Sequence, residues 1–474
     1  MEINANIINS PNILKKRYEN KKTTTLIEKL FVWSLILEPL LYFNIASGGQ
    51  FTGITLSVSR ILQIIVLSLL FFKFVKFKKP LQSIFSKLKI QKYLIQYLCL
   101  IIFATFFGAL FFNSYERTFA NLGTLDKQNT PFLKSWYFRP IFDCFLLIYY
   151  YFYFIFLTTY FFKSYLTLKY FFKKFFIVFN IFLLLGFIDL IMAYFTGSAL
   201  IKRHLGEDID VGFRFHSFGG EPRDAFVFLL YSICLIMIYN EFYVKTKNHK
   251  ILLLFSFIAL ILTQSVSGIL GILIGFAFAL FYFLRKLKIS AFYILGVVIF
   301  ITIILILLIP YSPRIILYLE GFSELFDYLE SGLELPYILL IQSVNFLPIW
   351  GLYMKLKDLN LFQIFFGSGF SSSAYFNMNY IADESYSNPN SQFTRLIFES
   401  GIFGFLVYLK FLTTPFFNLS NNFIHRNKSK IIIYFFLFLG ATLAHRSLTP
   451  FIFIGVLISI NKKIHNKTYL IKIT

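Results

Sequence analysis

The chain is poor in cysteine, in acidic residues and in the short motifs of common soluble enzymes. Its 474 residues include 3 cysteines, and 23 Asp and Glu against 45 Lys and Arg. Because Cys99, Cys144 and Cys234 all lie inside apolar runs, neither a disulfide framework nor a cysteine metal cluster is indicated. The sequence contains no phosphate-binding GxxxxGK(S/T) loop, no HExxH pair and no GxSxG nucleophile turn. The enzyme classes that depend on these motifs are therefore not expected.

Hydrophobic side chains are abundant instead. They make up 57% of the residues, and 66 of them are Phe, which is more than a soluble protein with an ordinary surface can hide. The formal net charge of +22 comes from lysines and arginines in short runs between apolar segments. That pattern is typical of the positive-inside rule and not of a nucleic-acid groove. We therefore predict an all-α polytopic membrane helical bundle, with membrane lipids around it and no nucleic-acid partner.

Apolar runs long enough to cross roughly 30 Å of hydrocarbon predict the transmembrane helices. Two stretches, 251–284 and 431–460, are too long for one helix, and we interpret each as a hairpin of two short helices. The first turns near 264–268 and the second near 445–450, which brings the total to about twelve spans. One kinked helix at 431–460 is the alternative and would put the C-terminus outside. Single spans are expected at 26–45, 54–74, 93–113, 140–162, 175–197, 223–244, 291–310 and 401–418.

The distribution of charge predicts the orientation. Basic clusters alternate along the chain with loops at 113–139, 198–224 and 311–400, which hold most of the acidic residues. Because short loops rich in Lys and Arg stay in the cytoplasm, both termini are expected inside and the acidic loops outside. Three parts follow: an N-terminal membrane bundle of about nine helices over 1–310, the long external loop at 311–400, and C-terminal membrane helices over 401–474.

The long loop at 311–400 has patterns of its own. Residues 313–331 place apolar side chains at helical spacing with acids between them, which predicts an amphipathic helix on the membrane surface or over a cavity. The apolar, proline-interrupted run at 335–350 is expected to dip into the bilayer or to pack on the bundle. Residues 366–373, Phe-Gly-Ser-Gly-Phe-Ser-Ser-Ser, are interpreted as a flexible turn.

One cluster of polar residues lies directly before an expected membrane helix. It contains Arg214, His216, Glu221 and Arg223. Arginine forks match two oxygens of a phosphate or diphosphate and keep their charge, and a carboxylate or an imidazole can accept a proton. The alternative is structural, because the Glu-Pro pair suits the first turn of a helix and its dipole. On that interpretation the cluster is a capped helix start with solvated charges.

A second cluster closes the long loop and contains Asn388, Asn390, Arg395 and Glu399. If a helix begins near Ser391, Arg395 and Glu399 are four residues apart on one face. A structural ion pair between them is then the alternative to a binding role.

Further ionisable residues lie within apolar stretches, where a charge is costly. Arg446, next to His445 in the last expected hairpin, is a functional candidate, with a simple boundary anchor as the alternative. Arg60, Asp143 and Asp189 are interpreted as partners between helices.

Several of these segments occur in the order and spacing of a known family. Residues 214–222 look like an arginine, glycine and Glu-Pro run before a helix, and 263–268 like a small-residue Ser-Arg-Ser-Gly hairpin. Residues 366–369, 388–390 and 399–404 look like a Gly-x-Gly, His-Asn and Glu-x-Gly-x-x-Gly series. This ordered set resembles the bacterial O-antigen polymerase and O-antigen ligase superfamily, membrane glycosyltransferases of the GT-C type.

The chain departs from the family pattern at two points. The ligase-type histidine before asparagine is replaced by Asn388-Pro389, and the hairpin arginine by Val266. The missing histidine and the Glu-Pro form of the first motif favour a polymerase over a ligase.

The resemblance implies a metal-independent enzyme of the bacterial inner membrane that works on the external, periplasmic face. It would transfer a polyprenyl-diphosphate-linked glycan onto another lipid-linked repeat unit and so build O-antigen or a capsule-like polysaccharide. A chain-length regulator protein is an additional candidate partner. The alternatives are a ligase that transfers the glycan to lipid A-core and, in another class, a flippase for lipid-linked oligosaccharides.

The implied mechanism assigns roles to the two clusters. Cations stabilise the diphosphate as charge develops on it, and a carboxylate or histidine accepts the proton of the acceptor hydroxyl. The first external loop, 46–53, offers no acidic pair, so neither a metal nor another cofactor is expected. The predicted site comprises Arg214, Arg223, Asn388, Asn390, Arg395 and Arg446 for diphosphate and substrate, and Glu221 as base, with His216 in reserve.

Overall fold

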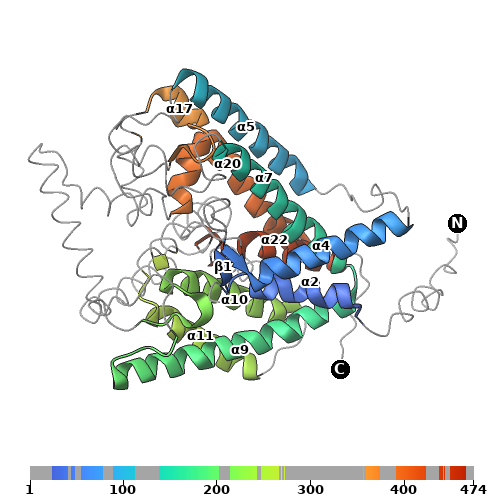
Figure 1. Ribbon diagram of the computed structural model, residues 1–474, viewed down its shortest axis with the longest axis vertical. Coiled ribbons are helices and arrows are strands. Elements are labelled where there is room, and N and C mark those ends of the chain that lie inside the picture. Colours follow the sequence, from blue (N-terminus) through green and yellow to red (C-terminus); the bar gives the residue numbers. More distant parts are fainter. Residues whose placement is uncertain are drawn as a thin grey trace, which may run out of the picture.

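The computed structural model describes residues 24–40, 44–47, 55–77, 89–112, 138–201, 214–242, 247–265, 268–269, 272, 356, 359–373, 391–422, 437–440, 442 and 449–465. These residues are mostly helical (Figure 1). The helices are α2 (Leu26–Leu37), α4 (Val58–Phe77), α5 (Lys89–Phe111), α7 (Arg139–Tyr150), the π-helix η4 (Tyr151–Leu157), α8 (Thr158–Phe161), α9 (Tyr165–Thr196), the 3-10 helix η6 (Ser217–Gly219), α10 (Pro222–Phe242), α11 (Lys247–Leu262), α17 (Leu361–Phe366), α20 (Gln392–Asn422) and α22 (Thr449–His465). Strands β1 (Asn44–Ser47) and β2 (Thr55–Ser57) form an antiparallel pair.

Five helical segments of the described chain are long and apolar enough to cross a membrane: Lys92–Phe111, Arg139–Phe161, Tyr165–Thr196, Pro222–Asn240 and Gln392–Phe416. They indicate a membrane-embedded helical protein. The prediction of about twelve spans extends to residues outside the described ranges, and so does most of the long loop predicted at 311–400.

The first predicted span, 26–45, differs from the structure. Helix α2 ends at Leu37, and the strand β1 begins at Asn44 and pairs with β2. Proline has no N–H with which to continue a helix, and Pro39 follows directly after the C-cap residue Glu38. The all-α prediction therefore lacks one small hairpin, which leads into α4.

A π-helical segment lies within the span that runs from α7 through η4 to α8. Helix α22 packs against η4 and α8, and Gly455 allows the close approach because a Cβ there would lie 2.2 Å from the carbonyl oxygen of Phe154. Segments of π-helix inside α-helices are frequent at functional sites. Here α22 packs directly on the segment.

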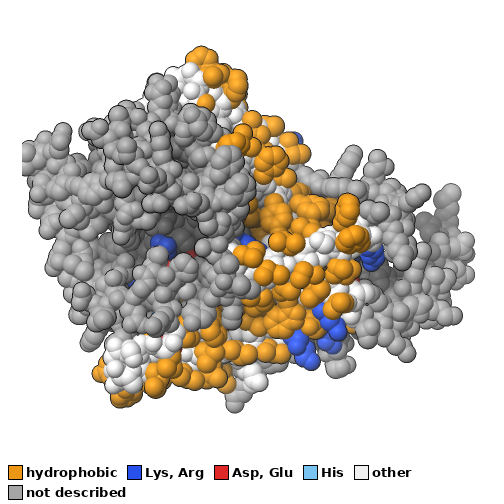
Figure 2. All heavy atoms as spheres, in the orientation of Figure 1, with side chains coloured by type: hydrophobic (Ala, Val, Ile, Leu, Met, Phe, Trp, Pro, Cys, Tyr) orange, Lys and Arg blue, Asp and Glu red, His pale blue; other side chains and the backbone are white. Residues whose placement is uncertain are grey.

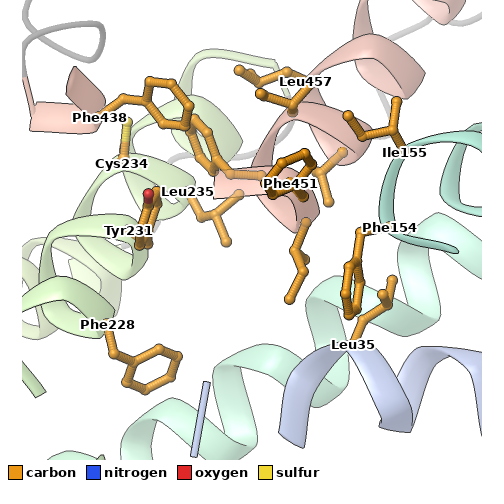
Figure 3. Packing of buried hydrophobic residues seen from close by; sticks show 14 of the residues in the cluster. Leu35, Phe154, Ile155, Phe228, Tyr231, Cys234, Leu235, Phe438, Phe451 and Leu457 are labelled. Carbon is orange, nitrogen blue, oxygen red and sulfur yellow. The ribbon is translucent and has the colours of Figure 1, made fainter. Parts of the chain in front are cut away.

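Aromatic rings fill much of the core. Figure 3 shows Tyr231 and Phe438 close together, with Phe451 and Leu457 on the facing helix. The ring centroids of Tyr231 and Phe438 are 5.8 Å apart, and the buried hydroxyl of Tyr231 lies 3.1 Å from Oγ1 of Thr442. The phenol thus packs as an aromatic ring and still satisfies its polar end.

Hydrophobic side chains also cover the outside of the described helices (Figure 2). On α5 the exposed residues Ile95, Ile102, Phe106 and Leu110 recur at helical spacing. Such an apolar stripe suits contact with lipid chains.

Helix α20 connects the parts of the bundle that matter for the site. It packs on α5, α17 and α22, and Figure 1 shows α17 beside the end of α5. Gly401 has non-helical torsion angles and divides α20 into two helical stretches. The structure around this break positions the candidate site.

Candidate functional site

The site begins with a short helix that is capped by its own sequence. Oδ1 of Asn360 accepts a hydrogen bond from the backbone N of Gln363 at 2.9 Å, and Oε1 of Gln363 accepts one from the backbone N of Asn360 at 3.4 Å. This reciprocal capping box fixes the start of α17. The helix ends at Phe366, and the C-cap residue Gly367 has a φ of +90°, which suits glycine.

The turn after α17 packs into the break in α20. The backbone N of Ser368 donates to the carbonyl oxygen of Phe398 at 3.0 Å, and that of Gly369 donates to the carbonyl oxygen of Glu399 at 2.9 Å. Because Gly401 interrupts the helical hydrogen-bond ladder, these carbonyls accept from the turn instead. The backbones of the two segments approach so closely that neither Gly367 nor Gly401 leaves room for a side chain.

The prediction of a flexible turn at 366–373 is corrected by these contacts. The side chains from Ser368 and from Phe370 to Ser373 are buried, and the backbone N of Phe370 donates to Oγ1 of Thr105 on α5 at 2.9 Å. The segment is therefore a packed part of the helical bundle.

Arg395 is the centre of the polar contacts around this turn. Its Nε donates to Oε1 of Glu399 at 2.9 Å, and its Nη2 donates to Oδ2 of Asp143 on α7 at 2.8 Å. Ser373 donates its hydroxyl to Oε1 of Glu399 at 2.8 Å, and Ser371 donates to Oδ2 of Asp143. The ion pair between Arg395 and Glu399 and the interhelical role of Asp143 are thereby confirmed.

This group of charges faces a cavity of about 340 Å³ between the helices. Two of the lining residues are arginines and four are carboxylic acids. Their distribution around the wall differs from a metal centre, because no three His, Cys, Asp or Glu residues of the described chain come close enough to hold a metal ion. The lining residues are Glu38, Pro39, Arg60, Tyr97, Asp143, Leu146, Leu147, Tyr150, Asp224, Phe370, Gln392, Arg395, Leu396, Glu399, Tyr408, Thr442, Thr449, Pro450 and Phe451.

A second hydrogen-bond network holds the wall formed by α2 and α4. Oε2 of Glu38 accepts hydrogen bonds from the hydroxyl of Ser59 and, at 2.6 Å, from Nε2 of Gln63. Oε1 of Gln63 accepts from the hydroxyl of Tyr149 on α7 at 2.6 Å. The network connects α4, α7 and the end of α2 through Oε2 of Glu38, a carboxylate that lines the cavity.

Arg214, the first predicted diphosphate ligand, contacts backbone in the structure. Its Nε donates to the carbonyl oxygen of Thr263 at 2.9 Å and its Nη2 to that of Gln264 at 3.1 Å. These carbonyls follow the last turn of α11, where helices leave acceptors unsatisfied. The arginine therefore acts as a cap for the C-terminal end of α11.

His216, the reserve base, is buried beside α9. Its Nε2 lies 3.5 Å from Oδ2 of Asp189, and its Nδ1 lies 3.1 Å from the carbonyl oxygen of Ser217. Oδ1 of Asp189 accepts the backbone N–H of Ile201 at 2.8 Å. Asp189 thus connects α9 to two neighbouring segments, as expected of a partner between elements.

Glu221 and Arg223 flank the start of α10. The carbonyl oxygen of Glu221 accepts the backbone N–H groups of Asp224 and Ala225, both at 3.0 Å. Nε of Arg223 is buried without a hydrogen-bond partner in the described part of the chain.

The described residues of the two predicted clusters differ in whether they line the cavity. Of the four residues in the first cluster, Arg214, His216, Glu221 and Arg223, none is among the described residues that line the cavity, although the neighbouring Asp224 is. Arg395 from the second cluster does line it. The remaining predicted site residues, Asn388, Asn390 and Arg446, lie outside the described residues.

Sequence reasoning missed several residues that the cavity shares with Arg395. Glu38 lies inside an expected membrane span, and its pairing with a following proline is the signal that marks it as a helix end. Ser371 and Ser373 follow Gly367 and Gly369, which both have a positive φ. Glycines of this kind indicate a close approach of backbones. The signal for Asp224 is that it is an acidic residue in the first turn of α10.

The chain was compared with protein-family models, curated proteins and solved structures, and none of them matches it.

Proposed function

We propose that this protein is a membrane glycosyltransferase that polymerises polyprenyl-diphosphate-linked oligosaccharide repeat units into O-antigen or a capsule-like polysaccharide. The observation that carries the proposal is the cavity of about 340 Å³, which two arginines and four carboxylic acids line inside an apolar helical bundle. Ionisable groups are expensive in a membrane and mark substrate or ion pathways there. The volume lies at the lower end of ligand pockets, roughly 300 to 1,000 Å³.

The guanidinium of Arg395 supports a role in binding the diphosphate. Its contacts with Glu399 and Asp143 use two N–H groups, and an arginine has five in a planar fork. The remaining N–H groups can bind oxygens of a phosphate, while the carboxylates hold the fork in one orientation. As the glycosidic bond breaks, such a cation stabilises the charge that develops on the leaving diphosphate.

The excess of carboxylates over arginines supports a role in binding the glycan. Sugar hydroxyls are hydrogen-bond donors, and an ionised carboxylate is an acceptor only. The lining also offers the phenol groups of Tyr97, Tyr150 and Tyr408. In this proposal the polyprenyl chain stays among apolar helix surfaces, and only the diphosphate and the first sugars enter the cavity.

The setting of the reaction belongs to the same proposal. The bundle has about twelve spans in a bacterial inner membrane, with both termini in the cytoplasm and the loop at 311–400 on the external face. Arg214, Glu221 and His216, which the sequence predicts as site residues, are not among the described residues that line the cavity, and variants at these positions test them separately. A ligase would differ in the acceptor, lipid A-core instead of a second repeat unit.

A flippase for lipid-linked oligosaccharides is the second candidate. The location of charged side chains in a cavity between helices favours it, because transporters bind substrate in such a place. A flippase moves its substrate unchanged, whereas a polymerase forms a new glycosidic bond.

The experiment that separates these functions uses the purified protein in liposomes with a lipid-linked repeat unit. A polymerase converts single repeats into a ladder of longer glycans on a gel, and a flippase moves them across the bilayer without a ladder. In cells with a defined repeat-unit pathway, deletion of the gene is expected to leave single repeats on the surface glycan. Complete loss of surface attachment instead supports the ligase.

Substitution of Arg395 tests the site within this experiment. Arg395→Lys keeps a positive charge but removes the planar fork, and we expect transfer to fall by about 100-fold or more, as when one transition-state donor is lost. Lys410→Met on the same helix is the control, because Lys410 stacks over Tyr93 and does not line the cavity. Ladder formation by Arg395→Lys at the rate of the control contradicts the assignment.

A further inference from the structure

Glu38, one of the carboxylates of the cavity, carries its hydrogen bonds on one of its two oxygens. Oε2 receives both hydrogen bonds, from Ser59 and Gln63. Oε1 accepts no hydrogen bond from the described residues. It is also not one of the atoms that are fully buried without a partner. Since Glu38 lines the cavity, Oε1 is open to it.

The network behind Glu38 keeps this carboxylate in place. Gln63 contacts both Glu38 and Oγ of Ser59, the latter at 3.0 Å, and accepts from the hydroxyl of Tyr149. Side chains from α4 and α7 therefore support a residue at the end of α2. Support of this kind holds a reacting group within the narrow range of positions that catalysis requires.

The other carboxylates of the cavity differ from Glu38 in what binds them. Asp143 and Glu399 also accept their hydrogen bonds on a single oxygen, Oδ2 and Oε1, but Arg395 is one of the donors to each. Arg395 and two serine hydroxyls bind Asp143 and Glu399. Asp224 belongs to the first turn of α10 and has further partners. In the described part of the chain, Glu38 therefore has an oxygen available to a ligand and no guanidinium hydrogen-bonded to it, while Arg60, which lines the same cavity, acts on it electrostatically.

We propose that Glu38 is a catalytic residue, the general base of the transfer. Its Oε1 contacts the acceptor hydroxyl. This inference rests on the proposed function. The acceptor oxygen forms a bond to the anomeric carbon of the donor sugar, and the bond from that carbon to the diphosphate oxygen breaks. The diphosphate leaves with the electron pair, and the hydroxyl proton moves to Oε1 of Glu38. The carboxylic acid then releases this proton to water.

The position of Glu38 explains why the arginine lies elsewhere on the wall. In a displacement that inverts the anomeric carbon, the base and the ligand of the leaving group act on opposite sides of that carbon. Glu38 belongs to the end of α2, and Arg395 to the first stretch of α20. Both residues line the same cavity of about 340 Å³.

Glu38→Gln tests the proposal because it keeps the size of the side chain and an acceptor for Ser59, but removes the basic oxygen. Loss of a positioned base lowers the rate by roughly 10²- to 10⁴-fold. In the liposome assay we expect the initial rate of ladder formation to fall by about 100-fold or more, whereas the concentration of lipid-linked donor that gives half the maximal rate changes by less than about 3-fold. The wild-type rate rises with pH as the carboxylic acid ionises, and the residual rate of Glu38→Gln lacks this rise.

Glu28→Gln is the matched control. Glu28 lies at the opposite end of α2 and forms the capping box with Thr25, and glutamine serves in a capping box as well as glutamate. This variant is expected to keep the wild-type rate and pH profile. Size-exclusion chromatography and thermal unfolding in detergent check that both variants are folded.

The outcomes separate the two proposals. A ladder formed by Glu38→Gln within about 3-fold of the wild-type rate overturns the role of Glu38 and leaves the proposed function intact. If the wild-type protein forms no ladder, both proposals are overturned. A variant that loses donor binding together with rate also overturns the proposal, because a base acts on the rate and not on donor affinity.

Discussion

Arg214 and Arg395 have the same side chain and almost the same burial, but they have different partners. Their exposed fractions are 7% and 9%. Arg214 donates to two backbone carbonyls beyond the end of α11, whereas Arg395 donates to two carboxylates at the wall of a cavity. Burial of an arginine therefore says little about its function, and the partners and the adjacent space decide it.

The two regions also differ in how their backbones are held. Around Arg395, the turn after α17 fits into the break in α20 through two backbone hydrogen bonds. Around Arg214, one backbone hydrogen bond, from Phe215 to the carbonyl oxygen of Leu262 at 2.9 Å, and the arginine itself hold the segment against α11. We expect the region around Arg395 to tolerate substitutions less well than the region around Arg214.

The largest effect is expected from Gly401→Ala. A Cβ at Gly401 would lie 2.3 Å from the carbonyl oxygen of Phe365, and φ is +64°. A left-handed alanine costs about 1–2 kcal/mol, and separating the backbones leaves buried hydrogen-bonding groups unsatisfied at about 1–3 kcal/mol each. We expect a loss of roughly 5 kcal/mol in the free energy of unfolding, or no folded protein.

Gly197→Ala is the control for Gly401→Ala. Gly197 also has a positive φ, +73°, but nothing lies within 4 Å of a Cβ there. Only the torsional cost of about 1–2 kcal/mol remains. Thermal unfolding in detergent compares the two variants, and equal losses contradict the proposed close approach of backbones.

The next largest effect distinguishes the two arginines directly. Arg395→Met leaves Asp143 and Glu399 buried without their cation, which costs about 3–5 kcal/mol. Arg214→Met leaves the backbone carbonyls of Thr263 and Gln264 without this donor, at about 1–3 kcal/mol each. We also expect Arg395→Met to abolish transfer, while Arg214→Met keeps transfer in proportion to the folded protein.

Unfolding and ladder formation, measured on the same samples, check this comparison. Loss of transfer by folded Arg214→Met contradicts a purely structural role. It supports instead the diphosphate-binding role that the sequence predicts for Arg214.

Local patterns predict much of the helical framework. The run predicted at 93–113 corresponds to α5 (Lys89–Phe111) and that at 223–244 to α10 (Pro222–Phe242). Long apolar runs between polar loops determine such helices by themselves. The contact between Arg395 and Glu399 was predictable for a similar reason, since four-residue spacing on a helix brings side chains together.

The cavity was not predictable from local patterns. Its wall combines residues from α4, α5, α7, α10, α20 and α22 with the two residues that follow α2, and helical periodicity does not say which helices become neighbours. The position of the turn after α17 depends on the distant Gly401. For the same reason the glycine and serine run looks like an ordinary flexible turn in the sequence.

The smallest effects are expected from the loss of two capping boxes, one at the start of α17 and one at the start of α2. Asn360→Ala removes the cap of α17, and Thr25→Ala removes the cap of α2. Each substitution is expected to cost about 1 kcal/mol in the free energy of unfolding. The effects on transfer should differ, because α17 leads directly into the turn whose serines bind Asp143 and Glu399.

We expect Asn360→Ala to lower the rate of ladder formation several-fold and Thr25→Ala to leave it unchanged. A small displacement of the turn changes how the carboxylates hold Arg395, and catalysis is sensitive to shifts of about 1 Å. The cap at Thr25 lies at the end of α2 opposite Glu38, so its loss frays the helix away from the cavity. Equal rates in the two variants at equal stability indicate that the turn only supports the fold.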